Sequence, residues 1–333
     1  MTASTTPAAA GTAGSVRPWL ARLHPGLFGI ALGIFGLGGA WRRLAPLIGE
    51  VANTVFVALF AVGAAILALL AVLWCAKLVR HFDVVRQEWV DPVHGAMIAL
   101  LPVSTLLAVA QIAPLNTDGQ AIATAVILAA LALQGAVAWQ VVALLSTGRM
   151  PAELVTPALY LPIVPGGFVG AMALDAVGLP GWGGLLIGMG IGGWALLEVR
   201  ILHRLFSGAL APALRPTLGI EMAPGAVGTL AAATLWPQLP AEALMIGLGI
   251  ASGPVFAVLT RWRWWTAVPF SFGFWSFSFP LAALAGAAVE AVRRGGWPTS
   301  MALGAVAIAS AVIAFLAVRT LWLLVNRRLL PSP

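Results

Sequence analysis

The sequence is poor in charge, in cysteine and in the motifs that would mark an enzyme. Only 9% of its 333 residues are Asp, Glu, Lys or Arg, whereas a soluble domain carries about 25%. So few charged groups cannot cover a surface that faces water, and 61% of the residues are hydrophobic. We therefore expect the chain to lie in lipid. The single cysteine, Cys75, excludes an internal disulfide framework.

The apolar stretches also lack the groups on which pumps and redox enzymes depend. Acidic residues fall mostly near the ends of these stretches, and no acid–base pair falls in the middle of one, as an ion-coupled pump would need. The four histidines are not paired at depth as haem ligands would be. An aspartate-rich diphosphate motif and a serine nucleophile motif are both missing. We expect a protein that is not an enzyme and that holds no cofactor or metal.

What the sequence does contain is ten long apolar stretches. Crossing about 30 Å of hydrocarbon takes roughly 20 helical residues. Because lipid provides no partner for an open strand edge, each crossing segment should be a helix. The expected spans are 27–41, 51–78, 93–113, 121–145, 159–177, 183–202, 218–235, 243–260, 268–289 and 300–324. The predicted fold class is an all-α integral membrane protein with ten transmembrane helices.

The basic residues are divided unevenly between the two sides that these spans define. Arg42, Arg43, Arg293 and Arg294 fall on one side, and the other 14 of the 18 Lys and Arg residues fall on the opposite side. The positive-inside rule then places both termini in the cytoplasm and the chain in the inner (plasma) membrane. The net charge of +7 is dispersed between spans, so we expect a lipid bilayer as partner and no nucleic acid.

Prolines recur on alternate spans at a regular spacing. Pro102, Pro162, Pro224 and Pro280 follow one another at intervals of about 60 residues, which favours a repeat of five helical hairpins. Proline breaks the hydrogen bonding of a helix, and in lipid the break must face protein or a watery cavity. We expect an inner ring of five kinked helices around a pore and an outer ring of five. The alternative is that these prolines are ordinary membrane-helix kinks.

Two aromatic stretches need separate interpretations. The segment "FSFGFWSFSFP" at 270–280 alternates like a strand, but in a membrane it must be the ninth helix, so its rings point to several sides. The segment "RWRWW" at 261–265 resembles a nucleic-acid or lipid-binding patch. Its position at the end of a span favours an interfacial belt of aromatic and basic residues.

Five segments together resemble the tellurite-resistance/dicarboxylate transporter family, which includes the bacterial TehA proteins and the slow anion channels of plant guard cells. The segments resemble its inner helices, occur in the same order and cover nearly the whole membrane domain. They are "FGIALGIFGLGGAWR" at 28–42, "DPVHGAMIALLPVSTLLA" at 91–108, "TPALYLPIV" at 156–164, "RPTLGIEMAP" at 215–224 and "FWSFSFPLAA" at 274–283.

The resemblance implies a homotrimer in which each protomer holds its own pore, closed by one phenylalanine of the ninth helix. In "WSFSFP" that residue is Phe279. The first helix lacks a proline in its core, so its glycines would supply the bend. The residues that we expect to line the pore or to break its helices are Gly29, Gly33, Pro102, Ser104, Pro162, Pro165, Pro224, Ser276 and Pro280.

Three polar residues are candidates for a cytoplasmic mouth. Glu221 lies three residues before Pro224, and His94 and Arg215 fall near the same side. The alternative for each is an interfacial residue whose side chain is satisfied by water and lipid headgroups. For Phe279 the alternative to a gate is an ordinary core residue.

The sequence thus predicts a passive channel or uniporter for small anions such as chloride and nitrate, with dicarboxylates as further candidates. The alternative is a proton-coupled transporter of dicarboxylates or tellurite-type oxyanions that uses Glu221 or His94. A third possibility, a membrane scaffold, leaves the repeated prolines unexplained. We expect a disordered tail over 1–20, a single transmembrane pore domain over 21–328 and a C-terminal tail over 329–333.

Overall fold

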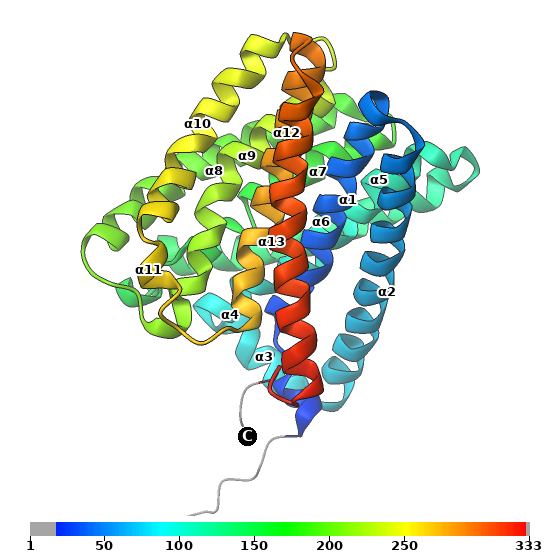
Figure 1. The fold of residues 1–333 in the computed structure, drawn as a ribbon. Helices are drawn as coiled ribbons and strands as arrows, with labels where there is room; N and C mark the ends of the chain where they lie inside the picture. The colour runs from blue at the N-terminus through cyan, green and yellow to red at the C-terminus, as the bar shows by residue number, and fades with distance from the viewer. Residues whose placement is uncertain (1–17, 331–333) are drawn as a thin grey trace, which may run out of the picture.

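A computed structural model describes residues 18–330, and this part of the chain is almost entirely helical, with no strand in it (Figure 1). The long helices are α1 (Phe28–Ile48), α2 (Glu50–Arg80), α5 (Leu100–Ile112), α6 (Gln120–Ser146), α7 (Val164–Ala176), α8 (Pro180–Phe206), α9 (Ala223–Leu235), α10 (Ala241–Thr260), α12 (Ser278–Gly295) and α13 (Thr299–Val325). The short α-helices are α3 (Phe82–Val90), α4 (Pro92–Ile98) and α11 (Trp262–Trp265).

Eight 3-10 segments complete the described part. They are η1 (Trp19–Arg22), η2 (Pro25–Leu27), η3 (Ala113–Leu115), η4 (Thr117–Gly119), η5 (Ala152–Leu154), η6 (Pro157–Tyr160), η7 (Pro212–Met222) and η8 (Phe272–Phe277). Residues 1–17 of the expected N-terminal tail and 331–333 of the expected C-terminal tail lie outside the described residues. The first described element, η1, begins at Trp19 and buries Leu20.

Nine segments within residues 18–330 are long and apolar enough to cross a membrane. They are Glu50–Arg80, Pro92–Leu115, Gln120–Ser146, Pro157–Ala176, Pro180–Phe206, Pro212–Leu235, Ala241–Thr260, Phe272–Gly295 and Thr299–Val325. The predicted first span, 27–41, forms most of α1 but is not among them. Helix α1 contains five glycines and the pair Arg42 and Arg43, which lower its mean hydropathy. Its role as a tenth span stays a prediction.

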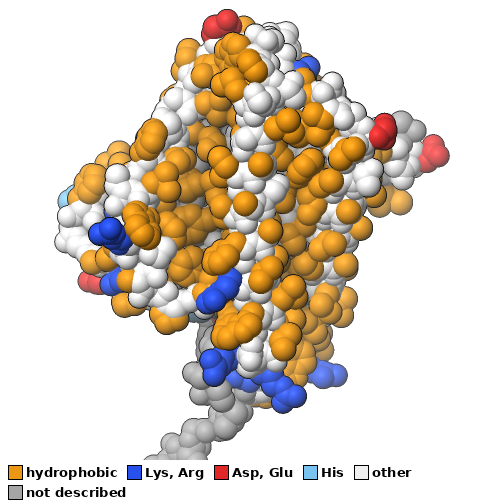
Figure 2. All heavy atoms as spheres, in the orientation of Figure 1, with side chains coloured by type: hydrophobic (Ala, Val, Ile, Leu, Met, Phe, Trp, Pro, Cys, Tyr) orange, Lys and Arg blue, Asp and Glu red, His pale blue; other side chains and the backbone are white. Residues whose placement is uncertain are grey.

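Burial alternates along these nine segments. In Pro92–Leu115, Pro157–Ala176, Pro212–Leu235 and Phe272–Gly295, between 61% and 94% of the most apolar stretch is buried inside the protein. In the other five segments only 17–28% is buried. Figure 2 shows the result: hydrophobic side chains cover the face along its whole height, and Lys and Arg gather at the lower end, where both described chain ends lie. The exposed segments therefore present the apolar surface that lipid would cover.

The buried segments differ from the expected kinked helices, because most of them are divided into a 3-10 part and an α part. The α parts begin at Leu100, Val164, Ala223 and Ser278, and a proline follows within the first three residues of each. The first four N–H groups of a helix have no acceptor within it, so proline in this turn costs no hydrogen bond. Proline is not confined to the buried segments, since Pro254 lies inside α10.

The buried helices contact one another in a cyclic order. Helix α1 packs against α5, α5 against α7, α7 against α9, α9 against α12, and α12 again against α1. Each also packs against the exposed helix that follows it in the chain: α2, α6, α8, α10 and α13 respectively. In Figure 1 both described ends of the chain lie at the lower end, and the turn between α12 and α13 lies at the upper end.

A buried lysine fixes the lower end of α2 to the segment before α1. Lys77 is 0% exposed, and its ammonium group donates to the carbonyl of Leu23 at 2.6 Å. It also contacts both carboxylate oxygens of Glu88 at 2.6 and 2.8 Å and lies 4.8 Å from the centre of the Trp74 ring. This cluster joins α2, α3 and the N-terminal segment.

Replacing Lys77 with methionine is expected to destabilise the protein by about 3–5 kcal/mol, because it leaves the Glu88 carboxylate without its buried partner. Thermal unfolding in detergent measures the effect. Arg80→Met is the control, since Arg80 lies in the same last turn of α2 but is exposed. Equal stability of the two variants would contradict the structural role of Lys77.

Candidate functional site

The α parts of the buried helices all begin at one small cavity. Its volume is about 60 Å³, which exceeds the roughly 10–15 Å³ that a single water requires. Five of its lining residues lie in the first turns of five different helices: Gly29 of α1, Leu100 of α5, Pro165 of α7, Ala223 of α9 and Phe279 of α12. The remaining lining residues are Gly26, Leu32, Met97, Leu161, Thr217, Ile220, Phe272, Gly273, Trp275, Ser276 and Pro280. We call this space the central cavity.

The central cavity carries no charged side chain among the described residues that line it. Its two hydroxyl groups are already engaged: Thr217 donates to the carbonyl of Leu214 at 2.6 Å, and Ser276 donates to the carbonyl of Pro216. Any electrostatic preference must then come from the backbone. The N-terminus of an α-helix carries a partial positive charge of about +0.5, which favours anions. At α1, α9 and α12 the first N–H group already donates to the preceding 3-10 turn, so the attraction that the helix ends offer an anion here is weak.

A second and larger cavity lies beyond Phe279, toward the upper end of the buried helices. It has a volume of about 370 Å³ and is lined by charged and polar groups from α1, α5, α7, α9 and α12. These groups are Arg42, Arg43, Gln111, Asp175, Thr234, Glu290 and Arg293. We call this space the upper vestibule.

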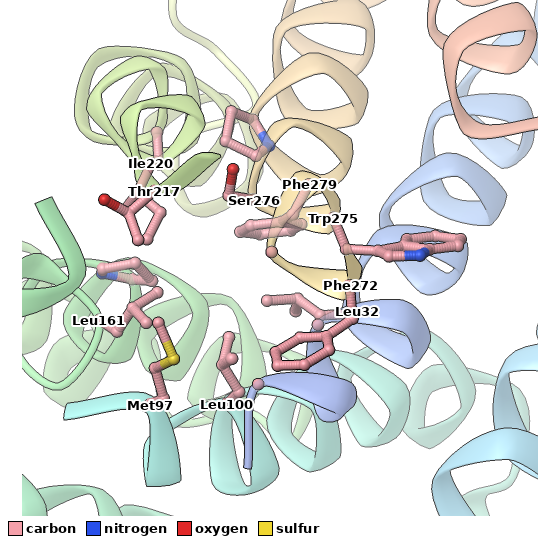
Figure 3. A pocket seen from close by; sticks show the side chains of 16 residues that line it. Leu32, Met97, Leu100, Leu161, Thr217, Ile220, Phe272, Trp275, Ser276 and Phe279 are labelled. Atoms are coloured by element: carbon pink, nitrogen blue, oxygen red, sulfur yellow. The ribbon is translucent and has the colours of Figure 1, made fainter. Parts of the chain in front are cut away.

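Among the described residues, Phe279 is the one that lines both cavities. Its side chain is 5% exposed. In Figure 3 the ring projects from α12 into the space between the elements, whereas the indole of the neighbouring Trp275 points away. Phe279 therefore lies between the central cavity and the upper vestibule.

A glycine of α1 provides the space that this ring occupies. A Cβ atom at Gly36 would lie 2.9 Å from Cδ2 of Phe279 and 3.1 Å from Cβ of Ala282, closer than van der Waals contact allows. Gly33, one turn earlier, provides similar room for Ser278, whose Oγ would lie 2.1 Å from a Cβ there. The glycines of α1 thus let α12 approach closely with the ring at the contact.

The structure brings together five of the residues expected to line a pore: Gly29, Pro165, Ser276, Phe279 and Pro280 all border the central cavity. The others lie beside it, at helix contacts or helix breaks. Ser104 is fully buried and donates to the carbonyls of Leu100 and Phe28, at 2.6 and 3.2 Å. Gly33 contacts α12, Pro102 and Pro224 lie in first turns, and Pro162 lies between η6 and α7.

The three mouth candidates occupy separate places outside the cavity lining. Glu221 is buried and forms an ion pair of 2.7 Å with Arg261. Arg215 stacks over the Trp264 ring, with its guanidinium carbon 4.7 Å from the ring centre. His94 contacts Asp91, and its ring centre lies 4.7 Å from that of His24.

Asp91 is the N-cap residue of α4, and its carboxylate holds the first turn of this helix and the His94 ring in place. Its carboxylate accepts hydrogen bonds from the backbone N–H groups of Val93 and His94, at 2.9 and 2.7 Å, and contacts the His94 ring at 2.8 Å. Burial alone would raise the pKa of Asp91, but these hydrogen bonds and the charge of His94 together lower it. The ring of His24 contacts that of His94 at a tilt of 51°, and it also accepts a hydrogen bond from the backbone N–H of Gly26, which lines the central cavity, at 2.9 Å.

The rings of the 270–280 segment are divided among different surroundings. Phe272 borders the central cavity and Phe279 borders both cavities. Phe270, Phe274 and Phe277 face a lateral apolar groove together with Trp265. Trp275 donates from its indole N–H to Thr320 of α13 at 2.8 Å. The rings do point to several sides, but the expectation that 270–280 lies within one helix is wrong, because 270–271 are not helical, 272–277 form η8 and α12 begins at Ser278.

The charged vestibule was not predicted from the sequence as a site. From the sequence, Arg42, Arg43 and Arg293 served only to compare the number of basic residues on the two sides of the membrane. Glu290 was considered only as an acidic residue near the end of a span. One signal was available, since Arg42 and Arg43 directly follow an apolar, glycine-rich run. The buried cluster of Glu198 with Tyr160 and Trp194 was missed as well.

Residues 22–323 match the sequence family described as "SLAC1: Voltage-dependent anion channel". The chain belongs to this family. A curated relative, the tellurite resistance protein TehA homolog of Haemophilus influenzae, is 28% identical over 311 residues, which cover 90% of each chain. The resemblance that the five inner-helix segments indicated is therefore confirmed. Family membership and the nine apolar helices of residues 18–330 together establish a multi-pass membrane protein.

Proposed function

We propose that this family member is a passive channel for small anions, with a pore through the centre of each protomer that Phe279 closes. One observation carries the proposal: a single residue, Phe279, borders both cavities at the centre of five helices that contact one another cyclically. Three such protomers would form the trimer that the family resemblance implies. Both termini would face the cytoplasm, so that the upper vestibule opens outside.

The two cavities support anions over cations for different reasons. Around the central cavity, which carries no charged side chain, the positive ends of the helix dipoles of α1, α5, α7, α9 and α12 supply only a weak attraction for anions. In the upper vestibule the guanidinium groups of Arg42, Arg43 and Arg293 outnumber the carboxylates of Asp175 and Glu290. A pore with weak attraction at its centre and a basic entrance lets anions enter without trapping them.

The absence of ionisable groups from the described lining of the central cavity favours passive conduction over proton coupling. Coupling requires a residue that binds a proton in contact with the transported anion. The two acid–base candidates, Glu221 and His94, are held by Arg261 and Asp91 and do not border that cavity. The alternative, proton-coupled transport of dicarboxylates or oxyanions, therefore finds no support at the central cavity, and the carboxylates that could still serve it are Asp175 and Glu290 of the upper vestibule.

Anion flux in proteoliposomes tests the proposal. Vesicles that contain the Phe279→Ala variant should lose an entrapped chloride or nitrate gradient at a rate that does not change when a pH gradient is imposed. Vesicles without protein provide the background. Flux that requires the pH gradient would support the coupled alternative, and an absence of flux for every anion would contradict both.

A further inference from the structure

The upper vestibule contains fixed charges that a phenylalanine gate alone does not require. Arg42 and Arg43 extend from α1, and Glu290 and Arg293 extend from α12, into the same space. The side chain of Glu290 is 11% exposed and that of Arg43 is 25% exposed. Burying charged groups to this degree is costly unless they are paired or functional.

Each of the three arginines that line the vestibule is held by contacts that leave several of its five N–H groups free for another partner. Arg42 donates to the carbonyl of Gln111, and its guanidinium carbon lies 5.3 Å from the centre of the Phe56 ring. Arg43 donates to the hydroxyl of Thr234 at 2.8 Å. Arg293 donates to Glu290 at 2.6 Å. These contacts orient the guanidinium groups before an anion binds, and the remaining N–H groups can donate to that anion.

The carboxylate of Glu290 occupies the centre of this cluster. It lies 2.6 Å from Arg293, 3.3 Å from Arg294 and 4.0 Å from Arg43. Arg294 does not line the vestibule, and its guanidinium also donates to the carbonyls of Ala233 and Leu239 at 2.7 and 3.0 Å, near the C-terminal end of α9. The contacts of Glu290 are those that a bound anion would make with the same guanidinium groups.

We propose that the upper vestibule is a binding site for one small monovalent anion, in which Glu290 competes with that anion for Arg43 and Arg293. This inference rests on the proposed function, because the anion that binds here is the one that would enter the pore. Glu290 then acts as a built-in competitor that keeps anion binding weak enough for conduction. Without it, three guanidinium groups would hold the anion too tightly to release it.

The charges that line the vestibule favour a monovalent ligand. Three arginines and two carboxylates, Asp175 and Glu290, leave a formal excess of one positive charge on the lining itself, and Arg294, which lies 3.3 Å from Glu290 behind the lining, adds another. A dicarboxylate such as malate would bring a second negative charge close to Asp175 and Glu290, which is unfavourable at short range.

Equilibrium binding to the purified protein tests the proposal without any measurement of flux. The thermal unfolding midpoint in detergent is recorded against chloride, nitrate or malate concentration, at constant ionic strength maintained with gluconate. An anion that binds only the folded state raises this midpoint as its concentration passes the dissociation constant. Wild type, Glu290→Gln and the control Glu242→Gln are compared. Glu242 is exposed in the first turn of α10 and does not line the vestibule.

For Glu290→Gln we expect half-maximal stabilisation by nitrate at a concentration about tenfold lower than for wild type, because a competing charge at short range has been removed. In this variant three arginines and one carboxylate line the vestibule, which is an excess of two positive charges on the lining. The affinity for malate should therefore increase more than the affinity for nitrate. Glu242→Gln should behave like wild type. Asp175→Asn removes the other carboxylate without breaking an ion pair of Glu290, and it should shift binding in the same direction if Glu290→Gln does not fold.

Equal half-maximal concentrations in wild type, Asp175→Asn and Glu290→Gln would overturn the proposal, as would tighter binding of malate than of nitrate to wild type. Because binding is measured in detergent, the two proposals fail separately. Anion binding without flux in proteoliposomes would contradict the proposed channel function but not the proposed binding site. Anion flux without specific binding would contradict the proposed binding site but not the proposed channel function.

Discussion

Phe279→Ala is expected to turn a closed protein into one that conducts anions, from near background to a sustained current. Phe279 borders both cavities, and the remaining described lining of the central cavity is mostly apolar and has no charged side chain. Truncation to a methyl group joins the two spaces into one path. Electrical recording from planar bilayers that contain purified wild type or variant measures the change.

The opposite outcome is expected if Phe279 is a core residue. Truncation of a packed phenylalanine costs about 3–5 kcal/mol and leaves a cavity without conduction. Phe277→Ala is the control, since its ring packs 4.6 Å from that of Trp265 and borders the lateral groove instead of the central cavity. We expect this control to lose stability and gain no current. Equal currents in wild type and Phe279→Ala would contradict the gating role and indicate that Phe279 is a core residue.

Gly167→Val is expected to destabilise the protein strongly, by about 3 kcal/mol or more. A Cβ atom at Gly167 of α7 would lie 2.8 Å from the carbonyl oxygen of Leu186 and 2.9 Å from Cα of Gly190, both in α8. Because these are backbone atoms, the two helices would have to separate. Thermal unfolding and the yield of monodisperse protein measure the effect.

Gly188→Val provides the matched control. Gly188 lies on the facing helix, α8, and a Cβ atom there would have no neighbour within 4 Å. The added side chain would lie on the exposed face of α8 in the single protomer, where nothing in the chain opposes it. We expect near-normal stability. A comparable loss in both variants would mean that the cost comes from helix propensity and not from the close approach of α7 and α8.

The sequence predicted the division into buried and exposed helices because that division depends on residue type. Proline and glycine are tolerated where a broken helix faces protein, and unbroken Ala, Leu, Val and Ile suit a lipid-facing helix. The position of Phe279 next to a helix break followed from Pro280 and from the family resemblance. Both inferences use short-range information that a single segment carries.

Other features depend on contacts between segments distant in the chain. The 3-10 segments before α7, α9 and α12 replace the expected kinks, because the prolines lie in first turns where they cost no hydrogen bond. The upper vestibule joins Arg42 of α1 with residues of α9 and α12. Without the fold, these arginines are indistinguishable from ordinary residues at the end of a span.

The reversal potential of Phe279→Ala in a planar bilayer tests the central claim most directly. With a tenfold gradient of potassium chloride across the membrane, an anion pore gives a reversal potential close to the equilibrium potential of chloride, and this potential should not move when the pH of one side is changed. A reversal potential near the equilibrium potential of potassium, or the absence of current through the variant, would contradict an anion pore closed by this ring.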